Sequence, residues 1–99
     1  MTLTSKQRAY LRGLANKLEP ILHAGKGGIS DAMVKQADDA LTARELIKGK
    51  VLETAPATAR EIAEDIAAKV NAQVVQVMGR TFVLFRQKEK ESQITLPKK

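Results

Sequence analysis

Four consecutive residues, Gly25-Lys26-Gly27-Gly28, have the chemistry to hold an anion in this 99-residue chain. Glycine has no Cβ atom, so its backbone amide can approach a ligand closely and adopt conformations that other residues avoid. A helix that begins just after the loop adds unpaired N–H groups and the positive end of its dipole. Lys26 adds a mobile ammonium that neutralises a phosphate without selecting a base sequence. The same four residues also suit an ordinary tight turn, which needs glycine for its geometry alone.

The loop does not match the two common nucleotide-binding motifs. A Walker A motif has a further glycine five residues before its Gly-Lys pair and a Ser or Thr after it. Here no glycine precedes Gly25 at that distance, and Gly27 follows Lys26. The dinucleotide fingerprint needs a third glycine where this chain has Ser30. The sequence therefore gives little support to nucleotide hydrolysis.

Excess positive charge is the second feature that bears on the choice of ligand. The chain has 17 Lys and Arg against 11 Asp and Glu, a formal net charge of +6. The surplus is concentrated in residues 1–19, 46–60 and 81–99. The candidate cations outside the loop are Lys6, Arg8 and Arg12 on a predicted helix, and Lys48 and Lys50 on one side of a predicted strand. If they lie beside the loop, they form a continuous path for a sugar-phosphate backbone; taken singly, each is also typical of a solvated surface.

The side chains that catalysis and metal binding require are scarce. The chain has no cysteine and one histidine, His23, which lies in an apolar segment and is expected to be packed or hydrogen-bonded there. The only aromatic residues are Tyr10, Phe82 and Phe85, and the two phenylalanines should point to opposite faces of one strand, with at least one in the core. We therefore expect a protein that is not an enzyme, uses no cofactor or metal, and does not recognise nucleic acid mainly by stacking.

Hydrophobic periodicity and capping residues predict three helices. They run from about Ser5 to Lys17, from Ser30 as N-cap to about Arg44, and from Thr58 as N-cap to Asn71 as C-terminal cap. Capping boxes mark two of these starts, Thr4 with Gln7 and Thr58 with Glu61.

Four short segments are expected to be strands: Ile21–Ala24, Leu46–Leu52, Val74–Met78 and Thr81–Phe85. Gly49 should weaken the second of them. Gly79-Arg80 suits a two-residue hairpin turn with positive φ at the glycine. The order helix, strand, helix, strand, helix, strand, strand requires a mixed sheet with at least one right-handed crossover. The predicted fold class is a single α/β domain in which helices pack on a mixed four-stranded sheet.

We expect one domain over residues 1–97, with residues 87–99 forming a partly ordered tail that contains Ile94 and Leu96. The N-terminal residues lack the apolar run of a secretory signal, and no stretch approaches the roughly 18 apolar residues that span a bilayer. Together with the absence of cysteine, this predicts a cytoplasmic protein without membrane contact.

Five segments of the chain carry a likeness to a known family. They are Leu3-Thr4-Ser5-Lys6-Gln7-Arg8 with Leu11-Arg12, Gly25-Lys26-Gly27-Gly28, Arg44-Glu45-Leu46-Ile47-Lys48, Ala72-Gln73-Val74-Val75-Gln76 with Gly79, and Val83-Leu84-Phe85-Arg86. In this order, over about residues 2–97, they resemble the CRM-domain family, and specifically its free-standing bacterial form, the YhbY type. Two positions depart from the family pattern: Gly49 stands where relatives usually have an apolar residue, and Arg44 where they commonly have His.

The resemblance implies an RNA-binding α/β domain similar to the C-terminal domain of a translation initiation factor. It also implies binding to rRNA in the precursor of the large ribosomal subunit, a role in ribosome assembly, and ribosomal proteins as further partners. By the same resemblance the glycine loop contacts RNA and the nearby cations assist. The RNA-binding residues expected are Gly25, Lys26, Gly27, Gly28, Lys6, Arg8, Arg12, Lys48 and Lys50.

Two other classes of function remain open from the residues alone. One is an adapter that recognises a ribosomal protein through its sheet or tail, with charge serving only solubility. The other is a small DNA-binding protein of the chromatin type. The sequence does not specify the oligomeric state.

Overall fold

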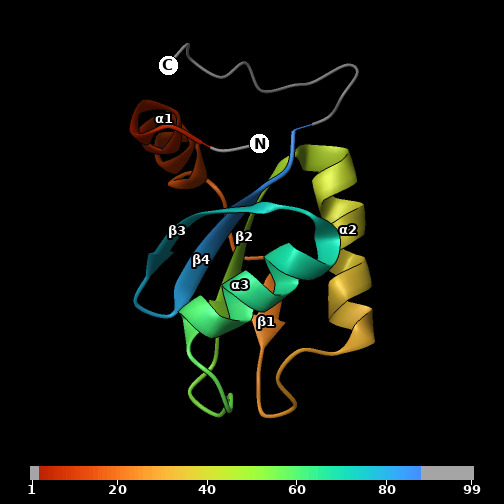
Figure 1. Ribbon diagram of the computed structural model, residues 1–99. Coiled ribbons are helices and arrows are strands. Elements are labelled where there is room, and N and C mark those ends of the chain that lie inside the picture. The colour runs from red at the N-terminus through yellow and green to blue at the C-terminus, as the bar shows by residue number, and fades with distance from the viewer. Residues whose placement is uncertain (1–2, 88–99) are drawn as a thin grey trace.

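Three helices and four strands follow one another in the predicted order (Figure 1). The computed structural model describes residues 3–87. The elements are α1 (Ser5–Ala15), β1 (Leu22–Ala24), α2 (Asp31–Arg44), β2 (Leu46–Val51), α3 (Ala59–Val70), β3 (Gln73–Met78) and β4 (Thr81–Phe85). The predicted tail beyond Gln87 lies outside the described residues.

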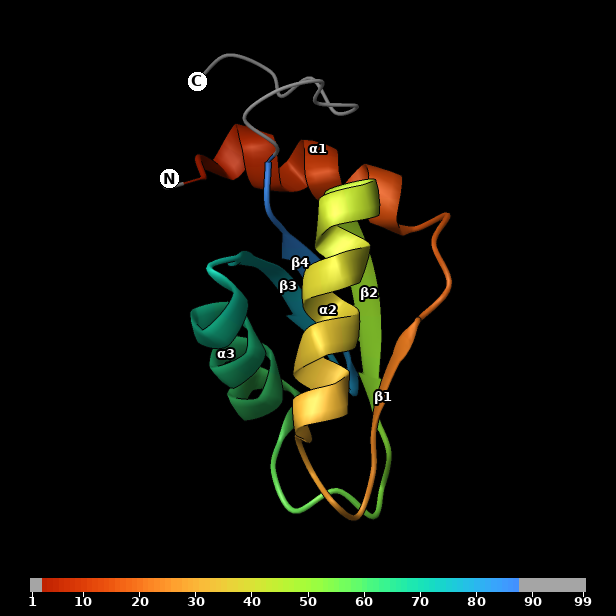
Figure 2. The same ribbon diagram turned by 90° about the vertical axis from the view of Figure 1, so that its right-hand side faces the viewer.

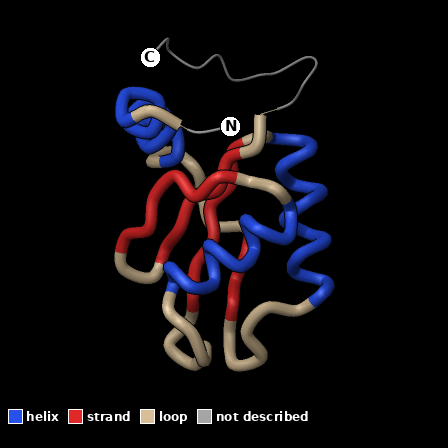
Figure 3. Tube along the Cα trace, viewed as in Figure 1, coloured by secondary structure: helices blue, strands red, loops and turns tan. Residues whose placement is uncertain are grey.

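The strands form one mixed sheet in the order β1-β2-β4-β3 (Figure 3). β1 and β2 are parallel and joined through α2, which is the crossover that the element order required. β4 is antiparallel to both of its neighbours, β2 and β3. The α/β class with a mixed four-stranded sheet is therefore confirmed.

The capping residues act as predicted at the helix starts. Thr4 and Gln7 bond each other's backbone amides at 3.0 and 3.1 Å, and Thr58 and Glu61 form the second capping box. α1 ends at Ala15, two residues before the predicted end at Lys17, because the chain tightens there. Lys17 and Leu18 bond the carbonyls three residues back, which closes the last turn without continuing the α-helix.

α2 and α3 cover one face of the sheet, whereas α1 lies across one end of the other face (Figure 2). The alternation of strand side chains produces these two cores. Ile47, Phe82 and Leu84 are buried toward α2 and α3, whereas their neighbours on the same strands are buried toward α1: Leu46, Val83 and Phe85. Phe82 and Phe85 are 1% and 0% exposed on opposite faces, so both belong to the core.

The expectation that His23 is packed is wrong. β1 alternates buried, exposed and buried side chains, and His23 is its exposed residue. β1 is an edge strand whose other face no helix covers, so a residue in an apolar sequence still points to solvent. The apolar run from Ile21 to Ala24 predicted a buried strand, but in β1 only Leu22 and Ala24 face the core.

Gly49 lies directly opposite Phe82 in the register of β2 and β4. A Cβ atom added to Gly49 would lie under 3.0 Å from three carbons of the Phe82 ring. The ring therefore occupies the volume that a side chain at position 49 would fill, and β2 continues unbroken through the glycine. An aromatic ring that covers a cross-strand glycine compensates for the missing side chain.

Replacing this glycine should disturb the core. We expect Gly49→Ala to lower the free energy of unfolding by about 1–3 kcal/mol in urea denaturation, because the ring must move. Phe82→Leu should remove most of that penalty when the two changes are combined. Gly13→Ala is the matched control, since a Cβ atom on this helical glycine meets nothing within 4 Å. An equal penalty for Gly49→Ala with and without the Phe82 ring would contradict this packing.

Arg86, the residue after β4, links the end of that strand to α2 and α3. Its Nη1 donates to Asp38 Oδ1 at 2.7 Å and to the Val70 carbonyl at 2.8 Å. Its Nη2 donates to the Asp38 carbonyl at 3.0 Å and to Thr42 Oγ1 at 2.9 Å. Asp38 and Thr42 belong to α2, and Val70 ends α3. Arg86, one of the cations of the basic segment 81–99, therefore uses its hydrogen bonds to stabilise the fold.

We expect Arg86→Met to lower the free energy of unfolding by about 2 kcal/mol, because several hydrogen bonds of a charged donor are lost together. Arg60→Met is the control: Arg60 pairs with Glu64 at 3.6 Å, and both side chains are mostly exposed. Such a surface pair contributes little, so this change should stay within about 1 kcal/mol. Equal losses for the two variants in urea denaturation would show that Arg86 does not join the helices.

Candidate nucleic-acid interface

The glycine loop is a tight turn with an open tip. The Gly28 amide donates to the Gly25 carbonyl at 2.9 Å, which leaves Lys26 and Gly27 at the centre of the turn, both exposed. Gly28 has φ of +67°, a value that favours glycine. Gly27 has no such φ, and a Cβ atom there would meet nothing within 4 Å. The fold itself therefore does not require glycine at position 27, whereas close approach of a ligand to the tip would.

The N-terminus of α2 contributes less to this site than the sequence suggested. Ser30 Oγ already accepts from the Met33 amide at 3.1 Å, and Asp31 adds a negative charge to the first turn. An anion at this helix end would meet the carboxylate of Asp31. The capacity to hold an anion thus lies in the turn and in the Lys26 ammonium.

The segment 52–58 supports the loop from the neighbouring strand. The Leu52 amide donates to the Ala24 carbonyl at 2.8 Å, one residue before the turn. Gly25 lies against Leu52 and Thr54, and Gly28 lies against Pro56. The turn is therefore fixed to the end of β2 while its tip stays open.

Lys48 and Lys50 lie on the face of the sheet that α2 and α3 leave uncovered. Lys50 is paired in register with His23 on β1 and with Thr81 on β4. Lys48 is one step closer to α1, opposite Val83. We call the uncovered surface the open face; its residues are His23, Lys48, Lys50, Gln76, Met78 and Thr81. None of these six side chains is acidic, so the open face is cationic.

The cations of α1 do not adjoin the glycine loop. α1 packs where β2 begins and β4 ends, against Leu46 and Phe85, whereas the loop lies where β2 ends. Figure 2 shows the helix and the loop at opposite ends of the molecule, whose long axis is 39 Å. Arg8 borders a hollow beside β3 together with Gln76 of the open face. The open face, with Lys48 and Lys50, therefore lies between the cations of α1 and Lys26 of the glycine loop.

None of the predicted site cations is engaged by an acid within residues 3–87. The cations that do form ion pairs in this range are Arg60, Lys69, Arg80 and Arg86. The predicted ones are Lys6, Arg8, Arg12, Lys26, Lys48 and Lys50. All six are available to an anionic ligand, and all but the half-buried Lys48 are exposed.

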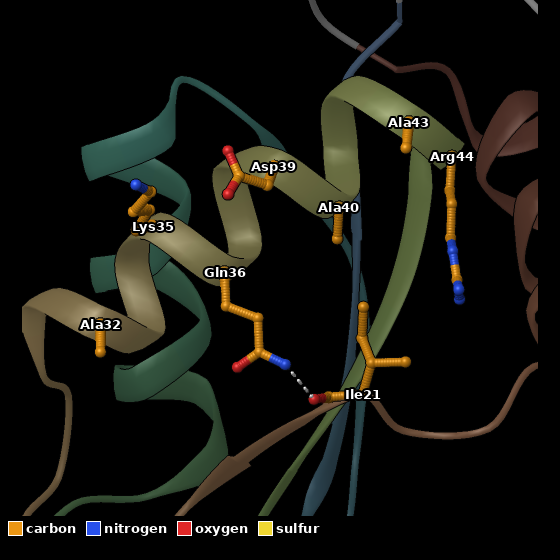
Figure 4. A pocket seen from close by; sticks show the side chains of 8 residues that line it. All are labelled: Ile21, Ala32, Lys35, Gln36, Asp39, Ala40, Ala43 and Arg44. Carbon is orange, nitrogen blue, oxygen red and sulfur yellow. Dashed lines mark hydrogen bonds between the residues drawn. The ribbon is translucent and has the colours of Figure 1, made fainter.

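A shallow hollow between α2 and the chain entering β1 lies apart from these cations of the site (Figure 4). Half of its lining residues are Ile21 and three alanines, and the other half are polar or charged residues of α2. Its central polar group, the Gln36 amide, already donates to the Ile21 carbonyl at 3.0 Å. The charged side chains of Lys35, Asp39 and Arg44 lie at separate points along α2 and do not converge (Figure 4), so the hollow lacks the features of a small-molecule site.

The described residues show neither a grouping for a metal ion nor a membrane span. Among residues 3–87, no three His, Asp or Glu side chains are grouped as metal ligands. No described helix is long and apolar enough to cross a bilayer.

Two features of this surface were not identified from the sequence. His23 joins the open face beside Lys50, and Arg80 lies at the hairpin tip near the glycine loop. The sequence contained a signal for Arg80, because the hairpin turn was predicted at Gly79-Arg80. The position of that turn relative to the loop depends on strand order, which the sequence left open.

Known proteins resemble this chain over nearly its whole length. The probable RNA-binding protein YqeI of Bacillus subtilis is 43% identical over 95 residues, covering 96% of this chain and 99% of its own. An RNA-binding protein of Haemophilus influenzae is 37% identical over 98 residues, covering 99% and 98%. The solution structure of a hypothetical Staphylococcus aureus protein, described as a candidate RNA-binding protein, matches with a TM-score of 0.80 and 43% identity, covering 97% of this chain and all of that one.

The family model of the CRS1 / YhbY (CRM) domain matches residues 3–86, which include every helix and strand and the glycine loop. The resemblance inferred from the five sequence segments is thereby confirmed. The chain belongs to the CRS1/YhbY (CRM) domain family.

Proposed function

We propose that this protein binds RNA through the glycine loop and the open face of its sheet. The observation that carries the proposal is the exposed tip at Lys26 and Gly27, where no packing requires glycine. The strand that leads into the loop, β1, belongs to the open face, which has no acidic side chain and presents Lys48 and Lys50. Close backbone approach and free ammonium groups are what a phosphate backbone needs.

Backbone contact is favoured over stacking by where the aromatic rings lie. Phe82 and Phe85 are buried, and Tyr10, 42% exposed, lies on α1 rather than on the open face. Proteins that read single strands by stacking present aromatic rings on their binding surface. Recognition here therefore depends on the phosphates and on the shape of the RNA.

The narrower role that we propose is binding to rRNA in the precursor of the large ribosomal subunit during assembly in the cytoplasm. It is supported by what the resemblance to the family implies, whereas the names of two relatives support only RNA binding in general. Ribosomal proteins that neighbour this rRNA are further contacts. The protein acts as a binding component and not as an enzyme.

Lys26→Ala should weaken binding to structured RNAs of unrelated sequence to a similar degree, because Lys26 contacts phosphate and not base edges. The slope of log affinity against log salt should fall by about one unit, since one fewer phosphate is neutralised. Fluorescence anisotropy across a salt series measures both quantities. Lys35→Ala, which removes an exposed lysine of α2, is the control and should change neither.

Unchanged affinity of Lys26→Ala at low salt would remove the loop from the binding site. Duplex DNA that competes as well as rRNA would favour the chromatin-type alternative. A purified protein that carries no nucleic acid and binds none in titration would favour the adapter.

Crosslinking in cells followed by sequencing of the attached RNA tests the narrower role. We expect enrichment of large-subunit rRNA, and sedimentation of the protein with precursor particles rather than with mature ribosomes. Crosslinks spread over messenger RNA, without enrichment of rRNA, would refute the role in assembly and leave RNA binding intact.

A further inference from the structure

The tip of the β3–β4 hairpin lies at the same end of the molecule as the glycine loop. The Val51 amide donates to the Arg80 carbonyl at 2.7 Å, and the next amide, Leu52, donates to the Ala24 carbonyl at 2.8 Å. The last residue of β2 and the residue after it thus hold the starts of both turns. β4 and β1 flank β2, so the backbone at Arg80 and the backbone at Ala24, just before the glycine loop, are separated by about two strand spacings, roughly 10 Å.

Arg80 is oriented by an acid from the segment that supports the loop. Its Nη1 lies 3.2 Å from Glu53 Oε1, with side chains 54% and 82% exposed. The pair borders a hollow formed by residues 51–59 and the hairpin tip. Both groups therefore face solvent beside the segment that supports the turn carrying Lys26.

This ion pair differs from those of α3. Arg60 with Glu64 and Lys69 with Asp65 are pairs one helical turn apart, typical of a solvated helix surface. Arg80 and Glu53 come from separate turns of the sheet, both at the proposed binding end. An exposed pair contributes little to stability, so a phosphate can take the place of the carboxylate.

We propose that Arg80 is a second phosphate-binding residue of the glycine-loop site and that Glu53 competes with RNA for it. The proposal rests on RNA binding by the loop. Lys26 and Lys50 hold one part of the strand, and a nearby phosphate then displaces Glu53 from Arg80. A phosphate already tethered to the protein competes at high effective concentration, whereas a single free anion does not. Glu53 thereby favours an extended polyanion over small phosphates.

The test is a double-mutant cycle on Arg80→Gln and Glu53→Gln, which remove charge while keeping side-chain length. The probe is a labelled RNA hairpin with single-stranded flanks, titrated by anisotropy from about 50 to 200 mM KCl. We expect Arg80→Gln to weaken binding about threefold to tenfold and to lower the salt slope by about one unit. Glu53→Gln should strengthen binding by about threefold, and this gain should disappear in the Arg80→Gln background.

Lys69→Gln and Asp65→Asn form the matched control, because they remove one positive and one negative charge from an exposed ion pair on α3. Their effects should be clearly smaller than those at Arg80 and Glu53. Equal effects for the two pairs would mean that net charge alone explains the change in affinity, which would overturn the proposal. If Glu53→Gln strengthens RNA binding equally in the Arg80→Gln background, Glu53 does not compete with RNA for Arg80.

Two outcomes distinguish this inference from the proposed function. If Lys26→Ala weakens binding but Arg80→Gln behaves like Lys69→Gln, the loop binds RNA and only the inference fails. If the unmodified protein does not bind the probe at any salt concentration, both fail. Thermal melting of each variant checks that the fold is kept.

Discussion

The parallel pairing of β1 with β2 determines where the functional side chains lie. Parallel neighbours end at the same edge of a sheet, so the turn after β1 and the segment after β2 meet and support each other. β4 runs the other way beside β2, so it begins at that edge and brings the β3–β4 turn there as well. Three connections that are far apart in the sequence thus share one end of the molecule. A different strand order with the same elements would separate Lys26 from Arg80.

The unequal covering of the sheet decides which cations remain available. α2 and α3 cover one face, whereas α1 covers only the end of the other. The free part of that face can carry lysines, because it stays in contact with water and their charges need not be buried. On the covered face, by contrast, Phe82 spreads over Gly49 and leaves no room for a side chain. The two faces of β2 therefore place opposite demands on neighbouring residues.

Local signals in the sequence predicted the elements well, but not the relations between them. Capping boxes, the Gly79-Arg80 turn and the alternation around Lys48 and Lys50 each depend on residues close in sequence, and the structure confirms them. The exposure of His23 was missed because it depends on β1 being an edge strand. The fit of Phe82 over Gly49 and the four hydrogen bonds of Arg86 depend on contacts between distant segments. Such contacts follow from strand order, which no single segment encodes.

The separation of α1 from the loop bears on the kind of RNA that suits this surface. The two groups of cations lie toward opposite ends of a 39 Å molecule, with Lys48 and Lys50 between them. A short oligonucleotide bound at Lys26 does not reach Arg8, whereas a folded RNA with a broad phosphate surface contacts both ends at once. Contacts at two ends of one rigid domain reinforce each other, because the first fixes the orientation for the second. The spacing of the cations therefore favours structured RNA, recognised by the arrangement of its backbone in space.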